Sequence, residues 1–300
     1  MRSPAFHQLV AALLCAFPCS ALAVLTTSPY QDQEEEEQEL VRLSEWPKLS
    51  SKAAARKDLA KVRKAGTEEM ARQGKAALLA EGAAVVPMVL KSYERERDEE
   101  VLERVYELLI GLTDATQTRL LAREFERKSE RIRVWALMRV AAFPDTGVRA
   151  EAEAALAAVR KRQDKASAEE LYAAGLCVTS TGSLEGLPEI SAVVLKGWSK
   201  HKLEIRAALE LVRGPAASTI VLVQLDTDSR KPRIAALRML AGCGDRASAA
   251  RVAPFLDETD NSIRIEAINA LRGIVDGDLP LDKLSAFEAI EVANEWKRRL

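Results

Sequence analysis

The side chains that most often carry enzyme chemistry are scarce in this sequence. Histidine occurs only at His7 and His201, and none of the stretches G-x-S-x-G, G-x-x-x-x-G-K-S/T, G-x-G-x-x-G or H-E-x-x-H is present. These stretches hold, in turn, a serine nucleophile, a nucleotide triphosphate, a dinucleotide and a catalytic zinc ion. We therefore predict no catalytic residue, no metal ligand and no cofactor, and the sequence disfavours an enzyme. His201, with no cysteine or histidine near it, is expected to be a surface residue.

The stretch DGDLPLD, residues 276–282, sets carboxylates close together, as a calcium loop does. Pro280 and Leu281 stand where such a loop needs a ligand and a glycine. We therefore predict that these carboxylates cap the start of a helix and bind no metal ion.

Basic residues gather between Lys52 and Lys64 and at Arg160–Arg162, where they could contact phosphate. Acidic residues are interleaved with them, and no aromatic side chains alternate with them as platforms for stacked bases. The whole chain has 44 lysines and arginines against 45 aspartates and glutamates, so it lacks a long-range positive field. We therefore predict no nucleic-acid partner.

The first residues have the layout of a secretory signal peptide. Arg2 precedes an apolar run at residues 9–17, and Ala21-Leu22-Ala23 supplies the small residues of a cleavage site. An uncleaved membrane anchor is the alternative, but this run is far shorter than the roughly 20 residues that a spanning helix needs. We predict residues 1–23 as a signal peptide cleaved after Ala23, and a secreted or periplasmic protein.

Residues 24–45 follow as an acidic leader, predicted to be disordered because its block of acids has little to bury. No later apolar run is expected to be long enough to span a membrane, so stable membrane insertion after cleavage is not predicted. Cys177 and Cys243 are expected to stay reduced, because the repeats described next would place them too far apart for a disulfide.

One segment recurs along the chain. Residues 98–111 and 129–142 align 31 residues apart without a gap, as do residues 229–242 and 260–273, and residues 200–213 form a weaker copy. The fourth, eighth, ninth and twelfth positions are apolar, which is the pattern of an amphipathic helix. The four strongest copies open on a residue that can cap a helix: Asp98, Ser129, Ser229 and Asp260.

Further helices are predicted between the copies, at residues 81–94, 116–127, 147–162, 185–197, 215–225 and 246–256. A helix pair of about 30 residues cannot enclose its own apolar face, whereas stacked pairs share one core. We predict an all-α fold, a right-handed α-solenoid of about six helix-pair repeats. Residues 46–80, with Trp46 and Leu59, form its N-terminal helical cap, residues 81–280 the repeat array, and residues 281–300 a C-terminal capping helix. The expected apolar stripe of that last helix is Leu284, Phe287, Ile290, Ala293 and Trp296.

The array resembles the HEAT-repeat family, including the short variety also found in phycobilin lyases. The resemblance covers roughly residues 66–280 and depends on the pairs Ile132-Arg133, Pro232-Arg233 and Ile263-Arg264, each followed by a small residue at Ala136, Ala236 or Ala267. The copies at 98 and 200 depart from it, with Leu102 and Glu204 in place of the arginine. We expect the repeated arginines to bind carboxylates from the turn before the next helix.

The resemblance implies a scaffold that holds a protein partner on the concave face lined by the recurring helices. We expect a monomer of bacterial origin, the latter from an Ala- and Arg-rich, Asn-poor composition. Two alternatives remain open: a bilin lyase-like enzyme that holds a tetrapyrrole, and a purely structural spacer.

Trp135 is the residue predicted to lie at the centre of the binding face, because it lies off the apolar stripe of its helix. An aromatic side chain near arginines is typical of binding hot spots. The other expected residues of this face are Arg131, Arg139, Arg238, Glu266 and Asn269. Packing against the following repeat is the alternative role for Trp135.

Export can be tested directly. If the signal peptide is removed as predicted, mass spectrometry of the mature protein from its native host should find Val24 at the N-terminus, because Ala21 and Ala23 satisfy the cleavage site. Intact Met1 in a membrane fraction would support the uncleaved anchor instead.

Overall fold

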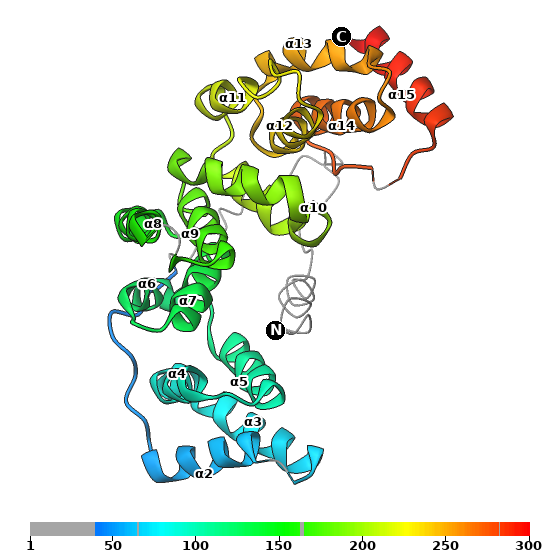
Figure 1. Ribbon diagram of the computed structural model, residues 1–300. Coiled ribbons are helices and arrows are strands. Elements are labelled where there is room, and N and C mark those ends of the chain that lie inside the picture. Colours follow the sequence, from blue (N-terminus) through cyan, green and yellow to red (C-terminus); the bar gives the residue numbers. More distant parts are fainter. Residues whose placement is uncertain (1–39, 65, 163–164, 282) are drawn as a thin grey trace, which may run out of the picture. The chain divides into compact units, whose positions relative to one another are not determined.

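The computed structural model describes residues 40–300 except 65, 163, 164 and 282. The predicted signal peptide and residues 24–39 of the acidic leader lie outside the described residues. Everything that is described consists of helices, turns and irregular segments without a strand, which confirms the all-α prediction (Figure 1). The chain divides into two compact units, residues 1–117 and 118–300, and this division falls inside the predicted repeat array.

Four α-helices make up the described part of the first unit: α2 (Lys52–Arg63), α3 (Glu68–Glu81), α4 (Val86–Arg95) and α5 (Glu99–Leu112). A 3-10 turn, η2 (Gly82–Val85), joins α3 to α4, and a second, η3 (Ala115–Gln117), follows α5. Helix α5 packs against α2, α3 and α4. The predicted N-terminal cap therefore contains two helices, and Trp46 lies in the irregular segment before them.

By length and composition alone, one stretch of the described residues, Glu68–Arg95, could cross a membrane. Helices of a protein core pass the same test, so the expectation that no continuous apolar run of spanning length follows the signal peptide stays a prediction. The stretch is not a single regular helix, since Gly82, with φ of +61°, ends α3, and α4 begins a turn later. Val86, Val89 and Leu90 of α4 are buried inside the protein.

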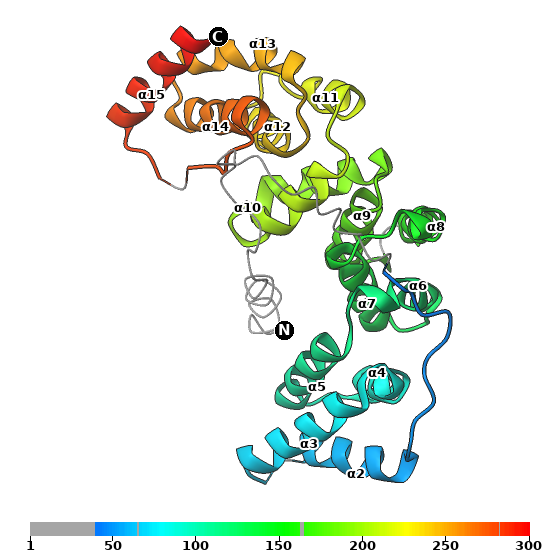
Figure 2. The same ribbon diagram turned by 180° about the vertical axis from the view of Figure 1, so that it is seen from behind.

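The second unit contains the remaining helices: α6 (Thr118–Ala122), α7 (Glu130–Ala142), α8 (Arg149–Arg162), α9 (Ala168–Ser180), α10 (Leu187–Glu210), α11 (Pro215–Leu222), α12 (Arg230–Cys243), α13 (Ala249–Val252), α14 (Asn261–Leu271) and α15 (Ala286–Arg299). Helices α7, α9, α10, α12 and α14 each pack against the next, and we call them the recurring-helix row. Helices α6, α8, α11 and α13 pack against α7, α9, α12 and α14 from one side (Figures 1 and 2).

The predicted apolar stripe forms the core between these helices. In α7, α12 and α14 the eighth, ninth and twelfth positions of the repeat are all buried. Small residues allow close approach: a Cβ on Gly273 would lie 2.1 Å from the carbonyl oxygen of Ala241 on the neighbouring α12. Helix backbones in such contact leave no room for a side chain, so Gly273 sets the spacing of α12 and its neighbour.

Two of the four predicted helix caps are present. Asp98 accepts a hydrogen bond from the backbone of Val101, and Asp260 accepts one from Ser262. The prediction was wrong for Ser129 and Ser229, whose side chains make no cap hydrogen bond. In place of a cap by Ser129, the side chain of Arg133 in α7 binds the turn before the helix. It donates to the carbonyls of residues 127 and 128 at 2.6 and 2.9 Å.

The stretch 165–179 fits the repeat only loosely in the sequence, and no helix was predicted there, although it forms α9. Its N-cap, Ser167, lies 38 residues after Ser129 rather than 31, so a search at fixed spacing passes over it. The weak copy was placed one residue too early: Ala208, Leu209 and Val212 are buried, which puts its first position at His201 instead of Lys200.

The two helices predicted at 185–197 and 200–213 join as α10, with a break at Gly197, whose φ of −133° and ψ of 20° are not helical.

The C-terminal helix α15 begins with a capping box made by Ser285 and Glu288. Its buried face is Ala289, Ala293 and Trp296. The predicted stripe was wrong for Phe287 and Ile290, which are 70% and 45% exposed. The two alanines let α15 lie close to α14. Because the alanine side of the helix faces α14, Phe287 and Ile290 face solvent.

The thiols should be inert in the folded protein. Cys177 and Cys243 are free and fully buried, and burial raises the pKa of Cys243 to about 12 and that of Cys177 further. Because the thiolate is the reactive form, a chromogenic thiol reagent should label neither cysteine before denaturation and both afterwards, in protein that lacks residues 1–23. Rapid labelling without denaturant, or a disulfide between the two cysteines in the non-reduced mass spectrum, would contradict this arrangement.

Candidate functional site on the recurring-helix row

Trp135, the predicted centre of the binding face, is 2% exposed. The expectation that it faces the surface was wrong, because α7 has no exposed side in the structure. Its indole Nε1 has no hydrogen-bond partner among the described residues. Burial of this kind fits the alternative that Trp135 packs within the protein.

The two arginines expected beside Trp135 do not frame a surface aromatic. Arg139 is 8% exposed, and its guanidinium lies over the ring of Phe143, 4.7 Å from the centroid. Arg131 is half-buried. These three predicted residues therefore share α7 without forming an open site.

The structure does bring together two of the predicted residues, Arg238 of α12 and Glu266 of α14. The guanidinium Nε of Arg238 lies 2.7 Å from Oε1 of Glu266. The same guanidinium lies over the indole of Trp198 on α10, 5.4 Å from the ring centroid. The pairing of an aromatic residue with an arginine that was predicted at Trp135 is thus found at Trp198, which is half-buried.

Sequence reasoning missed Trp198 because it ended the preceding helix at residue 197. In the structure α10 continues past this point, and Trp198 lies one turn before His201 on the same side of the helix. Trp198 and His201 are three residues apart, as residues on one side of a helix are. This spacing could have shown that the helix includes Trp198.

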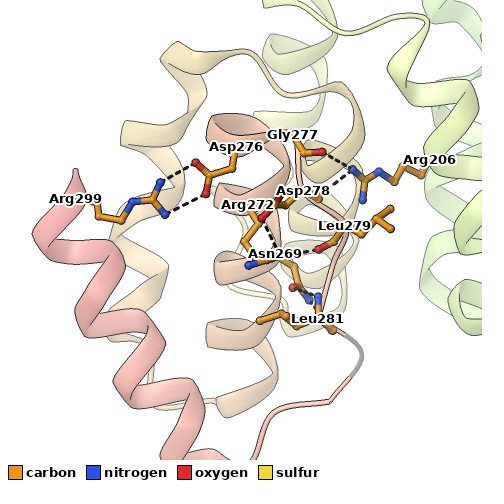
Figure 3. Close-up of polar contacts among 9 residues, drawn as sticks. All are labelled: Arg206, Asn269, Arg272, Asp276, Gly277, Asp278, Leu279, Leu281 and Arg299. Carbon is orange, nitrogen blue, oxygen red and sulfur yellow. Dashed lines mark hydrogen bonds and ion pairs between the residues drawn. The ribbon is translucent and has the colours of Figure 1, made fainter. Parts of the chain in front are cut away.

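A short segment of the chain, residues 277–281, lies against α10 and α14, and we call it the C-terminal strap (Figure 3). It begins where the π-helical turn Arg272–Asp276 ends at Gly277, whose φ of 72° is left-handed. The Nη2 atom of Arg206, on α10, donates to the carbonyls of Gly277 and Asp278 at 3.2 and 2.9 Å. Nε of Arg272 donates to the carbonyl of Leu279 at 3.2 Å.

Asn269, another predicted site residue, holds the far end of the strap (Figure 3). The amide of Leu281 donates to its Oδ1 at 2.8 Å, and its Nδ2 donates to the carbonyl of Leu281 at 3.4 Å. Asn269 is buried, so it is no open surface residue, but its carboxamide pairs with the main chain of one residue. Arg206 and Asn269 of the row, with Arg272 just after α14, thus bind the backbone of four strap residues.

Asp276 and Asp278, the acids of the DGDLPLD stretch that the structure describes, bind arginines. Asp276 pairs with Arg299 of α15 at 2.7 Å, and the neighbouring guanidinium lowers the pKa of Asp276. Asp278 pairs with Arg272 at 2.9 Å. The prediction that these acids cap a helix was wrong, because Ser285 caps α15.

Two glutamates occupy the fourth repeat position, which is apolar in the stronger copies. Glu204 of α10 is buried, and one carboxylate oxygen contacts both the hydroxyl of Tyr172 and Nδ1 of His201. The imidazole also lies 4.7 Å from the ring of Tyr172, so His201 is not the surface residue that was expected. Burial and the Glu204 carboxylate raise the pKa of Tyr172 well above its usual value.

The second buried glutamate, Glu170 of α9, is fully enclosed. Its Oε1 accepts from Nε of Arg133 at 2.5 Å and from Nη2 of Arg162 at 2.6 Å, while Oε2 has no partner among the described residues. Arg133 therefore binds a carboxylate, as predicted for the repeated arginines, but the carboxylate comes from the first turn of α9 and not from the turn before a helix.

The other two repeated arginines differ from each other. Arg233 approaches the carboxylate of Glu258 at 3.4 Å, as predicted. The prediction was wrong for Arg264, which donates to the carbonyl of Glu258 at 2.6 Å and to the side chain of Asn261 at 3.2 Å. Its guanidinium closes the turn before its own helix, six residues back, as Arg133 does at residue 127.

Comparison of the chain with models of protein families, with curated proteins and with solved structures found no match. Among the described residues no group of three histidine, cysteine, aspartate or glutamate side chains is placed to hold a metal ion. The geometry that remains is a surface of helices whose side chains bind main chain and frame a half-buried aromatic.

The hold on the strap should be measurable as stability. Asn269→Ala removes both hydrogen bonds to Leu281 and leaves a part-buried amide and carbonyl unpaired, so the free energy of unfolding should fall by about 1–3 kcal/mol. Urea unfolding followed by circular dichroism measures it, with Asn294→Ala on the exposed side of α15 as the matched control. Equal midpoints for the two variants would show that these bonds contribute nothing.

Proposed function

We propose that this protein is an exported scaffold, without catalytic activity, that binds an extended segment of a protein partner along the recurring-helix row. The fold that goes with this proposal is a right-handed α-solenoid of about six short HEAT-like helix pairs. The successive packing of α7, α9, α10, α12 and α14 supports it, since each helix of such an array contacts only its neighbours.

The observation that carries the proposal is the C-terminal strap. Arg206, Asn269 and Arg272 bind the main chain of a non-helical segment through four carbonyls and one amide. Main-chain hydrogen bonds give affinity without requiring a particular sequence. A surface that holds one segment of the chain in this way has the chemistry to hold a segment of another protein.

Trp198 and Arg238 supply the specificity in this proposal. A half-buried indole under a guanidinium combines a large contact area with a charge, and such residues dominate the binding energy of interfaces. The pair lies on α10 and α12, and Glu266, which fixes the guanidinium, lies one turn from Asn269 on α14. The partner's segment would therefore run beside the strap and across Trp198.

The proposal can be tested by site-specific photocrosslinking in the native host. A photoreactive amino acid at Lys202, one turn after Trp198, should capture a discrete partner, whereas the same residue at the exposed Val223 after α11 should not. Trp198→Ala and Arg238→Ala should each weaken binding of the captured partner about 30-fold, equivalent to ~2 kcal/mol. Phe287→Ala on α15 is the control for loss of an exposed aromatic side chain.

Circular dichroism and urea unfolding of each variant separate lost binding from lost folding. Equal capture at Lys202 and Val223 would contradict the proposed surface. Unchanged affinity in a folded Trp198→Ala variant would contradict the role given to the indole.

A further inference from the structure

Helix α2, in the first unit, carries an unusual concentration of positive charge. Between residues 52 and 64 the sequence has six lysines and arginines and a single acid, Asp58. Lys61 pairs with Asp58 at 2.6 Å, and Arg63 pairs with Glu96 at 2.8 Å.

The side chains of the other four cations make no hydrogen bond or ion pair among the residues that the structure describes. We call them the basic arc of α2: Lys52, Arg56, Lys57 and Lys64. All four are exposed, as are Ala53 and Ala60. At 100° per residue these six positions fall on one side of the helix.

The opposite side of α2 is buried through Ala55, Leu59 and Val62. Asp58 and Lys61 lie beside α3, where a Cβ on Gly74 would touch both residues. The position of Asp58 in the sequence suggested that it lies among these cations. In the structure it lies on a different side of the helix from the basic arc. With only alanine methyl groups between the cations, the arc can attract an anionic partner but has no apolar side chain to insert into one.

We infer that the basic arc binds the acidic segment of this same chain, residues 32–39. This segment contains six acids: Asp32, Glu34, Glu35, Glu36, Glu37 and Glu39. Cleavage after Ala23 would leave it on the mature protein. Because it is tethered to α2, its effective concentration at the arc is on the order of millimolar, far above that of a competing polyanion in solution.

The length of the connection allows this contact. Leu43 is fixed by its amide, which donates to the carbonyl of Thr116 at 2.7 Å, and Arg42 donates to the carbonyl of Ala115 at 3.0 Å. Eight residues lead from Leu43 to the N-cap Ser51, a distance of at most about 27 Å. Residues 32–39 lie four to eleven residues before Leu43, so they can span roughly 14 to 37 Å. Asp32, Glu34 and Glu35, which lie eight to eleven residues before Leu43, can therefore reach the start of α2 even when residues 43–51 are fully extended.

The binding is electrostatic, so salt weakens it. At about 1 M salt the Debye length falls to about 3 Å, and exposed charge pairs lose most of their attraction. Occupied by the acidic segment, the arc is hidden from other polyanions. Removal of the negative charge from the segment would expose it.

Zero-length carbodiimide crosslinking of the full mature chain tests the contact. Mass spectrometry should find Asp32, Glu34 or Glu35 joined to Lys52 or Lys57 in low salt, and these crosslinks should disappear at about 1 M salt. A mixture of ¹⁴N- and ¹⁵N-labelled protein should give crosslinks within one isotope only. Mixed-isotope crosslinks, or crosslinks to lysines away from α2, would overturn the inference.

Retention on immobilised heparin, a defined polyanion, gives a second measurement. A variant with all six acids changed to Asn or Gln should elute at higher salt than wild type, because the arc is uncovered. Adding Lys52→Gln, Arg56→Gln, Lys57→Gln and Lys64→Gln should abolish this increase. The matched control neutralises four exposed lysines that also have no partner among the described residues, namely Lys161, Lys165, Lys196 and Lys283.

The control should leave the increase largely in place. Equal elution of wild type and the acid-neutralised variant, or an equal loss of retention in the arc and control variants, would overturn the inference.

Discussion

The arrangement of residues 118–300 depends on apolar stripes that no recurring helix can bury alone. Each stripe is covered only when the next helix packs against it, so the row extends from α7 to α14 without a gap. The row is followed by α15, which covers the last stripe with Ala289, Ala293 and Trp296. Its outer side carries charged residues together with the exposed Phe287 and Ile290, so it is less polar than the end of a stacked array usually is.

Two buried glutamates interrupt this apolar pattern, and their partners explain how they are tolerated. Burying a carboxylate costs several kcal/mol unless it is paired and hydrogen-bonded. Glu170 is held by Arg133 from α7, and Glu204 by Tyr172 from α9. Each glutamate on one helix thus requires a particular residue on the helix before it. We interpret these pairs as contacts that fix the order and register of α7, α9 and α10. Purely apolar stripes would let one helix pack equally well against several others.

The sequence was sufficient wherever the repeat spacing was regular. The helices at 98, 129, 229 and 260 were predicted because the same apolar positions recur 31 residues apart, and they begin within a residue of the prediction. Helix α9 was missed because its spacing of 38 residues breaks that rule.

The candidate site was harder to predict for a different reason. A helical wheel shows that Trp135 lies off the stripe of its own helix, but it does not show what else covers that side. The contacts of the strap join Arg206 to residues 71 and 72 positions away, and nothing in local sequence indicates them. Arg238 and Glu266 were predicted together because they share a repeat-defined surface, and they form an ion pair.

The strap is fastened by its backbone, and this has a consequence for how the protein changes over evolutionary time. Arg206, Arg272 and Asn269 recognise peptide groups that nearly every amino acid provides. Substitutions at Leu279, which is 64% exposed, leave these bonds in place. Position 279 can therefore change in sequence while the path of the strap stays the same. Gly277, whose φ is left-handed, and Asp278, whose carboxylate pairs with Arg272, do not share this freedom. In a set of relatives, conservation would mark Arg206, Asn269 and Arg272 together with Gly277 and Asp278, and would pass over position 279.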